Sequence, residues 1–319
     1  MDIGVLTAPL TDEPLDDALA YLSDLGVDAV ELGAGSPHLP REEYVDDEGA
    51  QRELLETVEG HGLRISAVSS HNNPLHPDEE RAASDDEDLR AAVRLAADLD
   101  VNTVTCFSGL PAGGPNDEVP NWVAAPWPTE HKDALEYQWE EVAIPYWSDL
   151  ADYADDHGVD VGIEMHPNML VSEPGTMARL REATNDRIGA NFDPSHLYWQ
   201  GIDVPEAIRF LGERDAIHHF HAKDTGLYES NARIKGYLDT ADYTEEPDRS
   251  WLFRSIGYGH GEEHWKDVVS TLRMVGYEGA LSIEHEDSLT SSREGLEKGV
   301  EILRRAVFET RPGEAYWAE

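Results

Sequence analysis

The stretch Ile188-Gly-Ala-Asn-Phe-Asp-Pro-Ser-His196 decides the fold of this chain. Its short apolar residues predict a buried strand, and Pro194 ends that strand because proline cannot donate to a ladder of backbone hydrogen bonds. Asp193 and His196 therefore lie where a buried strand opens into a loop. A carboxylate and an imidazole at such a position are candidate ligands.

Three other segments follow the same plan, an apolar run that ends in carboxylates and imidazoles. They are Asp160-Val-Gly-Ile-Glu-Met-His166, Ile217-His-His-Phe-His-Ala-Lys-Asp224 and Ala280-Leu-Ser-Ile-Glu-His-Glu-Asp287. The spacings from Glu164 to Asp193 and from Asp193 to His221 are both roughly 30 residues, the length of one strand-helix unit. The gap from His221 to Glu284 is about twice as long, which predicts an insertion at about residues 223–260.

Further apolar runs extend this alternation over the whole chain. We expect strands at 3–6, 29–33, 63–69 and 102–107, ahead of strands that end near residues 164, 193, 222 and 283. We expect helices at 14–25, 51–59, 85–99, 130–157, 175–183, 204–211, 264–275 and 292–310. Pro145 should bend the fourth helix. Eight alternations predict an α/β protein with a single (β/α)8 TIM barrel that occupies residues 1–319 without a dividing linker.

The charge of the chain limits its setting and its partners. Acidic residues outnumber basic ones by 66 to 24, and the net charge of −42 is spread over the whole sequence. Such self-repulsion favours a halophilic setting, because molar salt shortens the screening length to about 3 Å. The same charge would repel the phosphates of nucleic acids, so no nucleic-acid partner is expected.

The cellular location is predicted from membrane and secretion signals that this sequence does not show. No apolar run approaches the roughly 20 residues of a membrane helix, so no membrane partner is expected. The first residues show no basic and then apolar leader, and Cys106 is the only cysteine, which fits a reducing compartment. We therefore expect a cytoplasmic protein in a high-salt cytoplasm. The long loop after the fourth strand and the insertion are candidate contacts of a homo-oligomer.

Four of the strand-end residues predict a metal site. The loops at the carboxyl ends of barrel strands share one face, so Glu164, Asp193, His221 and Glu284 should converge there. Three carboxylates in one cavity would repel one another unless a cation neutralised them. The oxygen-rich set predicts one divalent ion, Mn²⁺ ahead of Mg²⁺, Co²⁺ or Zn²⁺. The alternative is that each is an ordinary loop-end acid in an acid-rich chain.

Five further side chains are predicted to bind substrate: His71, His196, Lys223, Asp224 and His260. Lys223 could hold a substrate phosphate or carboxylate as a point charge, or form a salt bridge to Asp224 or another acid. His260, between two glycines, could close over the site or simply belong to a turn. Glu31 could bind a hydroxyl or make a structural hydrogen bond, and His166 could orient Glu164 or serve only its loop.

These residues resemble a known family of barrels. The segments Ile163-Glu164, Phe192-Asp-Pro-Ser-His196, His219-Phe-His-Ala-Lys-Asp224 and Ser282-Ile-Glu284 are similar to those of the xylose isomerase-like TIM barrels, which include sugar phosphate isomerases and epimerases. The resemblance covers about residues 2–307. It implies that Glu164, Asp193, His221 and Glu284 are the metal ligands and that His196 contacts substrate or metal.

The resemblance also implies a reaction in carbohydrate metabolism. The metal would bind two adjacent oxygens of a hydroxy-ketone and stabilise the enediolate formed when an α-proton leaves. Glu164 and Glu284 would be the catalytic pair, one removing the proton and the other returning it. The chain is therefore expected to be an enzyme, a divalent-metal-dependent isomerase or epimerase that acts on a small-molecule sugar or sugar phosphate.

Other reactions stay open on the same site. Loss of a β-hydroxyl from the same intermediate would give a lyase of the inosose-dehydratase or keto-sugar type. Ketose 3-epimerases carry an additional Glu and Arg where this chain has Leu170 and Leu227. A phosphodiesterase like endonuclease IV is a further alternative, but its extra histidine ligand on strand four is absent from Cys106-Phe-Ser108, and the acidic charge disfavours DNA.

Overall fold

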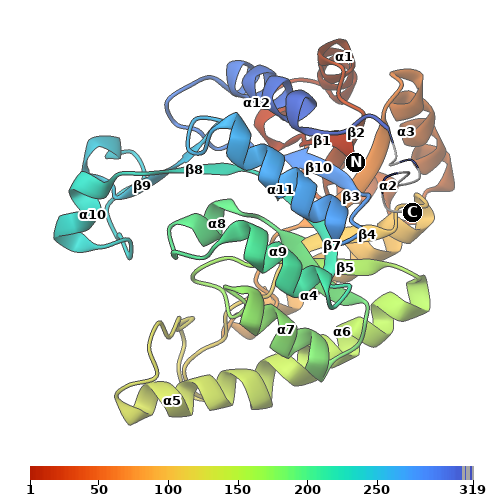
Figure 1. Cartoon of the computed structure of the whole chain (residues 1–319). Helices are drawn as coiled ribbons and strands as arrows, with labels where there is room; N and C mark the ends of the chain where they lie inside the picture. Colours follow the sequence, from red (N-terminus) through yellow and green to blue (C-terminus); the bar gives the residue numbers. More distant parts are fainter. Residues whose placement is uncertain (311–312, 314–316, 318–319) are drawn as a thin grey trace.

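Eight parallel strands close into a barrel in the computed structural model, which describes residues 1–310, 313 and 317 (Figure 1). Around the barrel the order is β1-β10-β7-β6-β5-β4-β3-β2. The strands are β1 (Asp2–Leu6), β2 (Ala29–Gly33), β3 (Arg64–Ser70), β4 (Thr103–Phe107), β5 (Asp160–Glu164), β6 (Ile188–Phe192), β7 (Ile217–Ala222) and β10 (Ala280–Ile283). β1 pairs with both β2 and β10, which closes the ring. The predicted (β/α)8 fold is confirmed.

Helices cover the outside of the barrel (Figure 1). They are η1 (Ala8–Leu10), α1 (Leu15–Leu25), α2 (Arg41–Tyr44), α3 (Glu48–Gly60), α4 (Glu79–Asp98), α7 (Pro174–Ala183), α8 (Ser195–Tyr198), α9 (Val204–Gly212), α11 (Glu262–Met274) and α12 (Ser292–Ala306). α4 begins earlier than predicted because the Asp78 side chain caps the backbone N–H groups of Glu80 and Arg81. Its first turns carry no apolar stripe, so hydrophobic periodicity could not reveal them.

The long helix predicted at 130–157 is divided into three parts. α5 (Thr129–Glu136) leads into the π-helical segment η2 (Tyr137–Ala143), and α6 (Ile144–His157) follows. Pro145 lies in the first turn of α6, directly after η2, and because the backbone stays helical through Ala143 and Ile144, a carbonyl of the preceding turn lacks the N–H that proline cannot supply. The irregularity therefore lies directly before the proline that was expected to bend the helix.

The segment 223–260 after β7 has secondary structure of its own. β8 (Asp224–Leu227) pairs antiparallel with β9 (Trp251–Arg254), and α10 (Glu229–Lys235) and η3 (Glu246–Asp248) lie between them. In Figure 1 the β8-β9 ribbon and α10 project away from the ring of strands. The stacked indoles of Trp199 and Trp251, 4.9 Å apart, hold this ribbon to the segment that follows α8.

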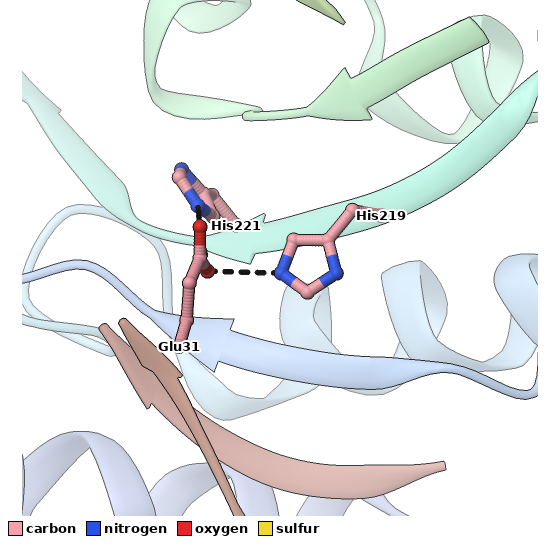
Figure 2. Close-up of side chains that lie close together, drawn as sticks. All are labelled: Glu31, His219 and His221. Carbon is pink, nitrogen blue, oxygen red and sulfur yellow. Dashed lines mark hydrogen bonds and ion pairs between the residues drawn. The ribbon is translucent and has the colours of Figure 1, made fainter. Parts of the chain in front are cut away.

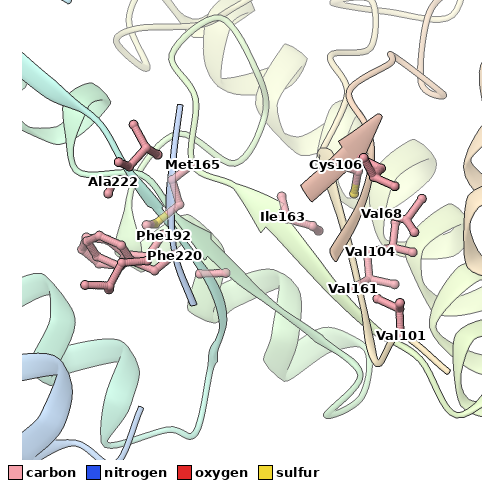
Figure 3. Close-up of a cluster of buried hydrophobic side chains, with 14 of the residues drawn as sticks. Val68, Val101, Val104, Cys106, Val161, Ile163, Met165, Phe192, Phe220 and Ala222 are labelled. Atoms are coloured by element: carbon pink, nitrogen blue, oxygen red, sulfur yellow. The ribbon is translucent and has the colours of Figure 1, made fainter. Parts of the chain in front are cut away.

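Alternating residues of the strands serve two different environments. Val161, Ile163, Phe192 and Phe220 are fully buried in the hydrophobic core (Figure 3). The residues between them on β6 and β7, such as His221, are polar and contact one another across the barrel. Because side chains alternate along a strand, the apolar set faces the helices and the polar set faces the barrel interior.

The structure also bears on the membrane prediction. None of the described helices is long and apolar enough to cross a membrane.

Candidate metal and catalytic site

Four side chains from separate strands meet at one end of the barrel. Glu164 ends β5, His221 lies in β7, and Asp193 and Glu284 directly follow β6 and β10. One oxygen or nitrogen atom of each lies within 4.8 Å of the others. Nδ1 of His221 lies 3.2 Å from Oε2 of Glu164 and 3.2 Å from Oε2 of Glu284. The structure therefore brings the four predicted ligands together.

The free atoms of this cluster fit a divalent cation. Oδ2 of Asp193 and Oε2 of Glu284 are buried and accept no hydrogen bond of good geometry from the described residues. His196 lies 3.2 Å from the first oxygen and Lys223 3.2 Å from the second, but neither is placed to donate well, so both oxygens keep lone pairs that a divalent cation could take. Three carboxylates and one imidazole form a donor set that suits Mn²⁺, Mg²⁺ or Co²⁺ and that Zn²⁺ also accepts.

The protonation of the carboxylates also favours a cation. Burial alone would raise the pKa of Glu164, but hydrogen bonds from His196 and His71 hold it well below its ordinary value. Burial likewise opposes ionisation of Glu284, but the charge of Lys223 lowers its pKa to about 2. Both groups are therefore ionised at neutral pH and can act as ligands or bases.

His196 and His71 border the cluster. Nε2 of the buried His196 lies 3.0 Å from Oε1 of Glu164 and 3.2 Å from Oδ2 of Asp193. Burial would lower the pKa of His196, but the charge of Asp193 raises it to about 9. Nε2 of His71 lies 3.3 Å from Oε2 of Glu164, and 20% of the His71 side chain is exposed. Both imidazoles are within reach of a molecule bound at the carboxylates.

Lys223 contributes a positive charge to the same cluster. Its Nζ atom lies 3.2 Å from Oε2 of Glu284 and also pairs with Glu286. The ammonium lies 4.2 Å from the centre of the Phe253 ring, a cation–π contact. The structure therefore shows the predicted salt bridges of Lys223, with Glu284 and Glu286 as the acids and not Asp224 among the described pairs.

Asp224 and His260 make their contacts with the end of the insertion instead. Oδ2 of the buried Asp224 accepts hydrogen bonds from the backbone N–H groups of Gly257, Gly259 and His260, at 3.0, 3.1 and 2.9 Å. Its Oδ1 atom lies 2.9 Å from Nδ1 of His260, whose ring stacks on Tyr198. Because both oxygens of Asp224 are engaged, this residue anchors the loop. The hydrogen bonds of Asp224 and His260 fix the end of the insertion. Substrate binding by these two residues stays a prediction.

Two residues left without a firm role by the sequence meet inside the barrel. Glu31 on β2 is fully buried, and its Oε2 atom lies 2.9 Å from Nε2 of His219 and 3.0 Å from Nε2 of His221. Figure 2 shows the carboxylate of Glu31 between the two imidazoles. Sequence reasoning assigned no role to His219. The sequence signal that could have revealed His219 is the alternation His219-Phe220-His221, which puts two imidazoles on one face of a buried strand.

Asn191 and His166 complete the surroundings of the cluster. Nδ2 of Asn191 lies 3.1 Å from Nδ1 of His221 and 3.3 Å from Oε2 of Glu164, a role the sequence did not reveal. The His166 ring packs 4.1 Å from the His196 ring, and burial and the charge of His196 lower its pKa to about 3. His166 is therefore neutral. Its Nδ1 donates to the backbone carbonyl of Pro167, which agrees with the predicted loop role, and its ring packs against His196.

The fold and this cluster define a class of protein, the (β/α)8 barrels with a carboxylate-rich site at the carboxyl ends of the strands. The family model described as xylose isomerase-like TIM barrel matches residues 19–306. The chain belongs to this family, and the resemblance seen in the sequence is confirmed.

Two relatives by sequence cover different shares of the chain. The protein YfiH of Bacillus subtilis (strain 168), described as uncharacterized, is 37% identical over 96% of this chain and 99% of its own length. An inosose isomerase of Halalkalibacterium halodurans is 28% identical over 57% of this chain and 58% of its own length. The first shares the whole barrel with this chain, and the second matches little more than half of it.

Two solved structures share the fold. IolI, a protein crystallised with a bound zinc atom, has a TM-score of 0.67 and 17% identity, covering 97% of this chain and 100% of its own. The probable 3-DHS dehydratase AsbF of Bacillus anthracis has a TM-score of 0.66 and 15% identity, covering 95% of this chain and 99% of its own. At such low identity these similarities establish the barrel alone.

Proposed function

We propose that the chain is a metal-dependent enzyme that isomerises or epimerises a small carbohydrate, a sugar or sugar phosphate. The observation that carries the proposal is the approach of two ionised carboxylates, Glu164 and Glu284, to one nitrogen of His221 from different strands. Epimerisation moves a proton between the two faces of one carbon, and isomerisation moves it between two adjacent carbons. Both require a base and a proton donor beside the reacting carbon. The similarity to an inosose isomerase supports a polyol-derived ketone as the substrate class.

Each residue of the cluster has a role in this proposal. A divalent ion held by Glu164, Asp193, His221 and Glu284, with Mn²⁺ favoured over Mg²⁺, Co²⁺ and Zn²⁺, would stabilise the charge of an enediolate. One glutamate removes the α-proton and the other returns it. His196 and His71 orient the substrate oxygens by hydrogen bonds, and Lys223 attracts a negative group of the substrate.

Elimination of a β-hydroxyl is the second candidate function, and the position of Lys223 favours it. The ammonium group lies 3.2 Å from Oε2 of Glu284, so a proton donor adjoins one of the two bases. After a glutamate takes the α-proton, Lys223 would protonate the departing hydroxyl, which leaves as water and gives an enone. A nuclease is disfavoured because a net charge of −42 repels DNA.

Solvent isotope exchange tests the proposed function. The purified protein, loaded with Mn²⁺, would be incubated in deuterated water with a panel of keto-sugars, sugar phosphates and inososes in molar salt. Deuterium at the carbon beside the carbonyl, with no loss of oxygen, is the expected result. An ultraviolet-absorbing enone would identify the lyase instead. Absence of exchange with the whole panel would contradict the proposal.

We also propose that the protein works in a salt-loaded cytoplasm, and this makes a prediction about stability. Raising KCl from about 0.1 M to about 1 M shortens the screening length from about 10 Å to about 3 Å. The urea concentration at half-unfolding should therefore rise, because repulsion among the 66 acidic residues weakens. Sorbitol of equal osmolality is the control. A midpoint that is unchanged or lower in KCl would remove the halophilic interpretation.

A further inference from the structure

Glu31 is held on both of its oxygens by side chains from other strands. Oε1 accepts a hydrogen bond from Oγ1 of Thr105 at 2.7 Å. Oε2 accepts one from Oγ of Ser282 at 2.7 Å and one from Nε2 of His219 at 2.9 Å. Nε2 of His221 lies 3.1 Å from Oε1 and 3.0 Å from Oε2. Residues of β2, β4, β7 and β10 thus converge on one carboxylate inside the barrel, and Figure 2 shows the two imidazoles of β7 beside it.

The two nitrogens of His221 face different groups. Nε2 faces Glu31, and Nδ1 faces Glu164 and Glu284. An ionised carboxylate can only accept a hydrogen bond, so the proton lies on Nε2. Nδ1 lies 3.1 Å from the side-chain amide nitrogen of Asn191, which can only donate, so the lone pair lies on Nδ1. That lone pair is directed at the carboxylates of Glu164 and Glu284. A carboxylate that accepts the second N–H of a ligand histidine fixes both its tautomer and its ring orientation.

We propose that Glu31 is a positioning residue, which presents Nδ1 of His221 to the metal ion. The inference rests on the proposed metal site and adds a residue to it from the opposite part of the barrel. His219, Thr105 and Ser282 hold Glu31 in place in turn. Glu31, His219 and His221 also have the composition of a second metal site. Glu31 does not require an ion, however, because four side-chain donors already satisfy its oxygens.

Zinc affinity of variants tests this role without any substrate. Glu31→Gln keeps the shape of the side chain but presents an N–H₂ group to His221, which disfavours the required tautomer. Zinc affinity, measured by competition with a chelator, should fall about 10- to 100-fold, and the visible spectrum of the Co²⁺ protein should change. Glu182→Gln on α7, an exposed position, should change neither. Ser282→Ala, which removes one donor to Glu31 and no contact to His221, should have a smaller effect than Glu31→Gln.

A measurement on the unchanged protein covers the case in which Glu31→Gln does not fold. In histidine-labelled protein loaded with zinc, nuclear magnetic resonance should show His221 with its proton on Nε2 and the metal on Nδ1. Metal on Nε2, two zinc ions per chain, or an undiminished affinity of Glu31→Gln would overturn the inference while leaving the proposed metal dependence intact. An unchanged protein that binds no divalent metal would overturn the proposed function itself.

Discussion

Glu164→Gln should abolish most of the isotope exchange expected of this protein. The amide cannot act as a base, and removal of a general base typically costs about 10²–10⁴-fold in rate. The amide is also a weaker metal ligand, and it presents N–H groups to His196 and His221, whose nitrogens lie 3.0 and 3.2 Å from the carboxylate of Glu164. The exchange rate in deuterated water and the metal content per chain are the two measurements.

Glu182→Gln is the matched control for this variant. Glu182 lies on the exposed side of α7, so the same change of charge there should leave both the exchange rate and the metal content unchanged. Circular dichroism of Glu164→Gln should match that of the unchanged protein, because the substitution preserves side-chain volume. A Glu164→Gln protein that retained its metal and exchanged at the full rate would refute the catalytic assignment.

Phe220→Ala should destabilise the barrel by about 3–5 kcal/mol, the usual cost of removing a large buried aromatic side chain. Phe220 is fully buried, and its ring stacks on that of Phe192 with 5.6 Å between centroids and 5° between planes. The two rings belong to adjacent strands and lie on the face of the sheet that packs against the helices (Figure 3). Reversible unfolding in urea, followed by tryptophan fluorescence, measures the change in free energy.

Phe308→Ala provides the comparison for this core variant. Phe308 is 57% exposed and contacts Arg273 through a cation–π interaction, so its removal should cost less than about 1 kcal/mol. Phe220→Leu should fall between the two, since it keeps part of the buried volume. A cost for Phe220→Ala as small as that for Phe308→Ala would mean that the stacked pair does not support the barrel.

The strands and the four clustered residues could be predicted because their signals are local. A buried parallel strand requires a short apolar run, and the polar residue at its end falls on the same face of the barrel in every unit. The shared position of Glu164, Asp193, His221 and Glu284 is therefore predictable from the sequence. The start of α4 and the π-helical segment η2 were missed, because polar first turns and a widened helical turn leave no mark in hydrophobic periodicity.

The partners of the remaining polar residues depended on positions far apart in the chain. Asp224 and His260 looked like site residues because they follow a ligand and end an insertion, yet they bind each other and the loop around them. Lys223, which directly precedes Asp224, forms an ion pair with Glu284 instead. Adjacent side chains on a strand point to opposite sides, so closeness in sequence to a ligand did not decide which of them would reach the cluster.

The sequence by itself determined the barrel, the family and the four residues gathered at its mouth, since apolar alternation and strand-end chemistry act within each unit. Only the tertiary structure decided which nitrogen of His221 faces the carboxylates and which faces Glu31. Closing the barrel brings β2 and β7 face to face across 190 residues of chain. The hydrogen bonds that orient a buried imidazole are made through space, between groups that no local pattern connects.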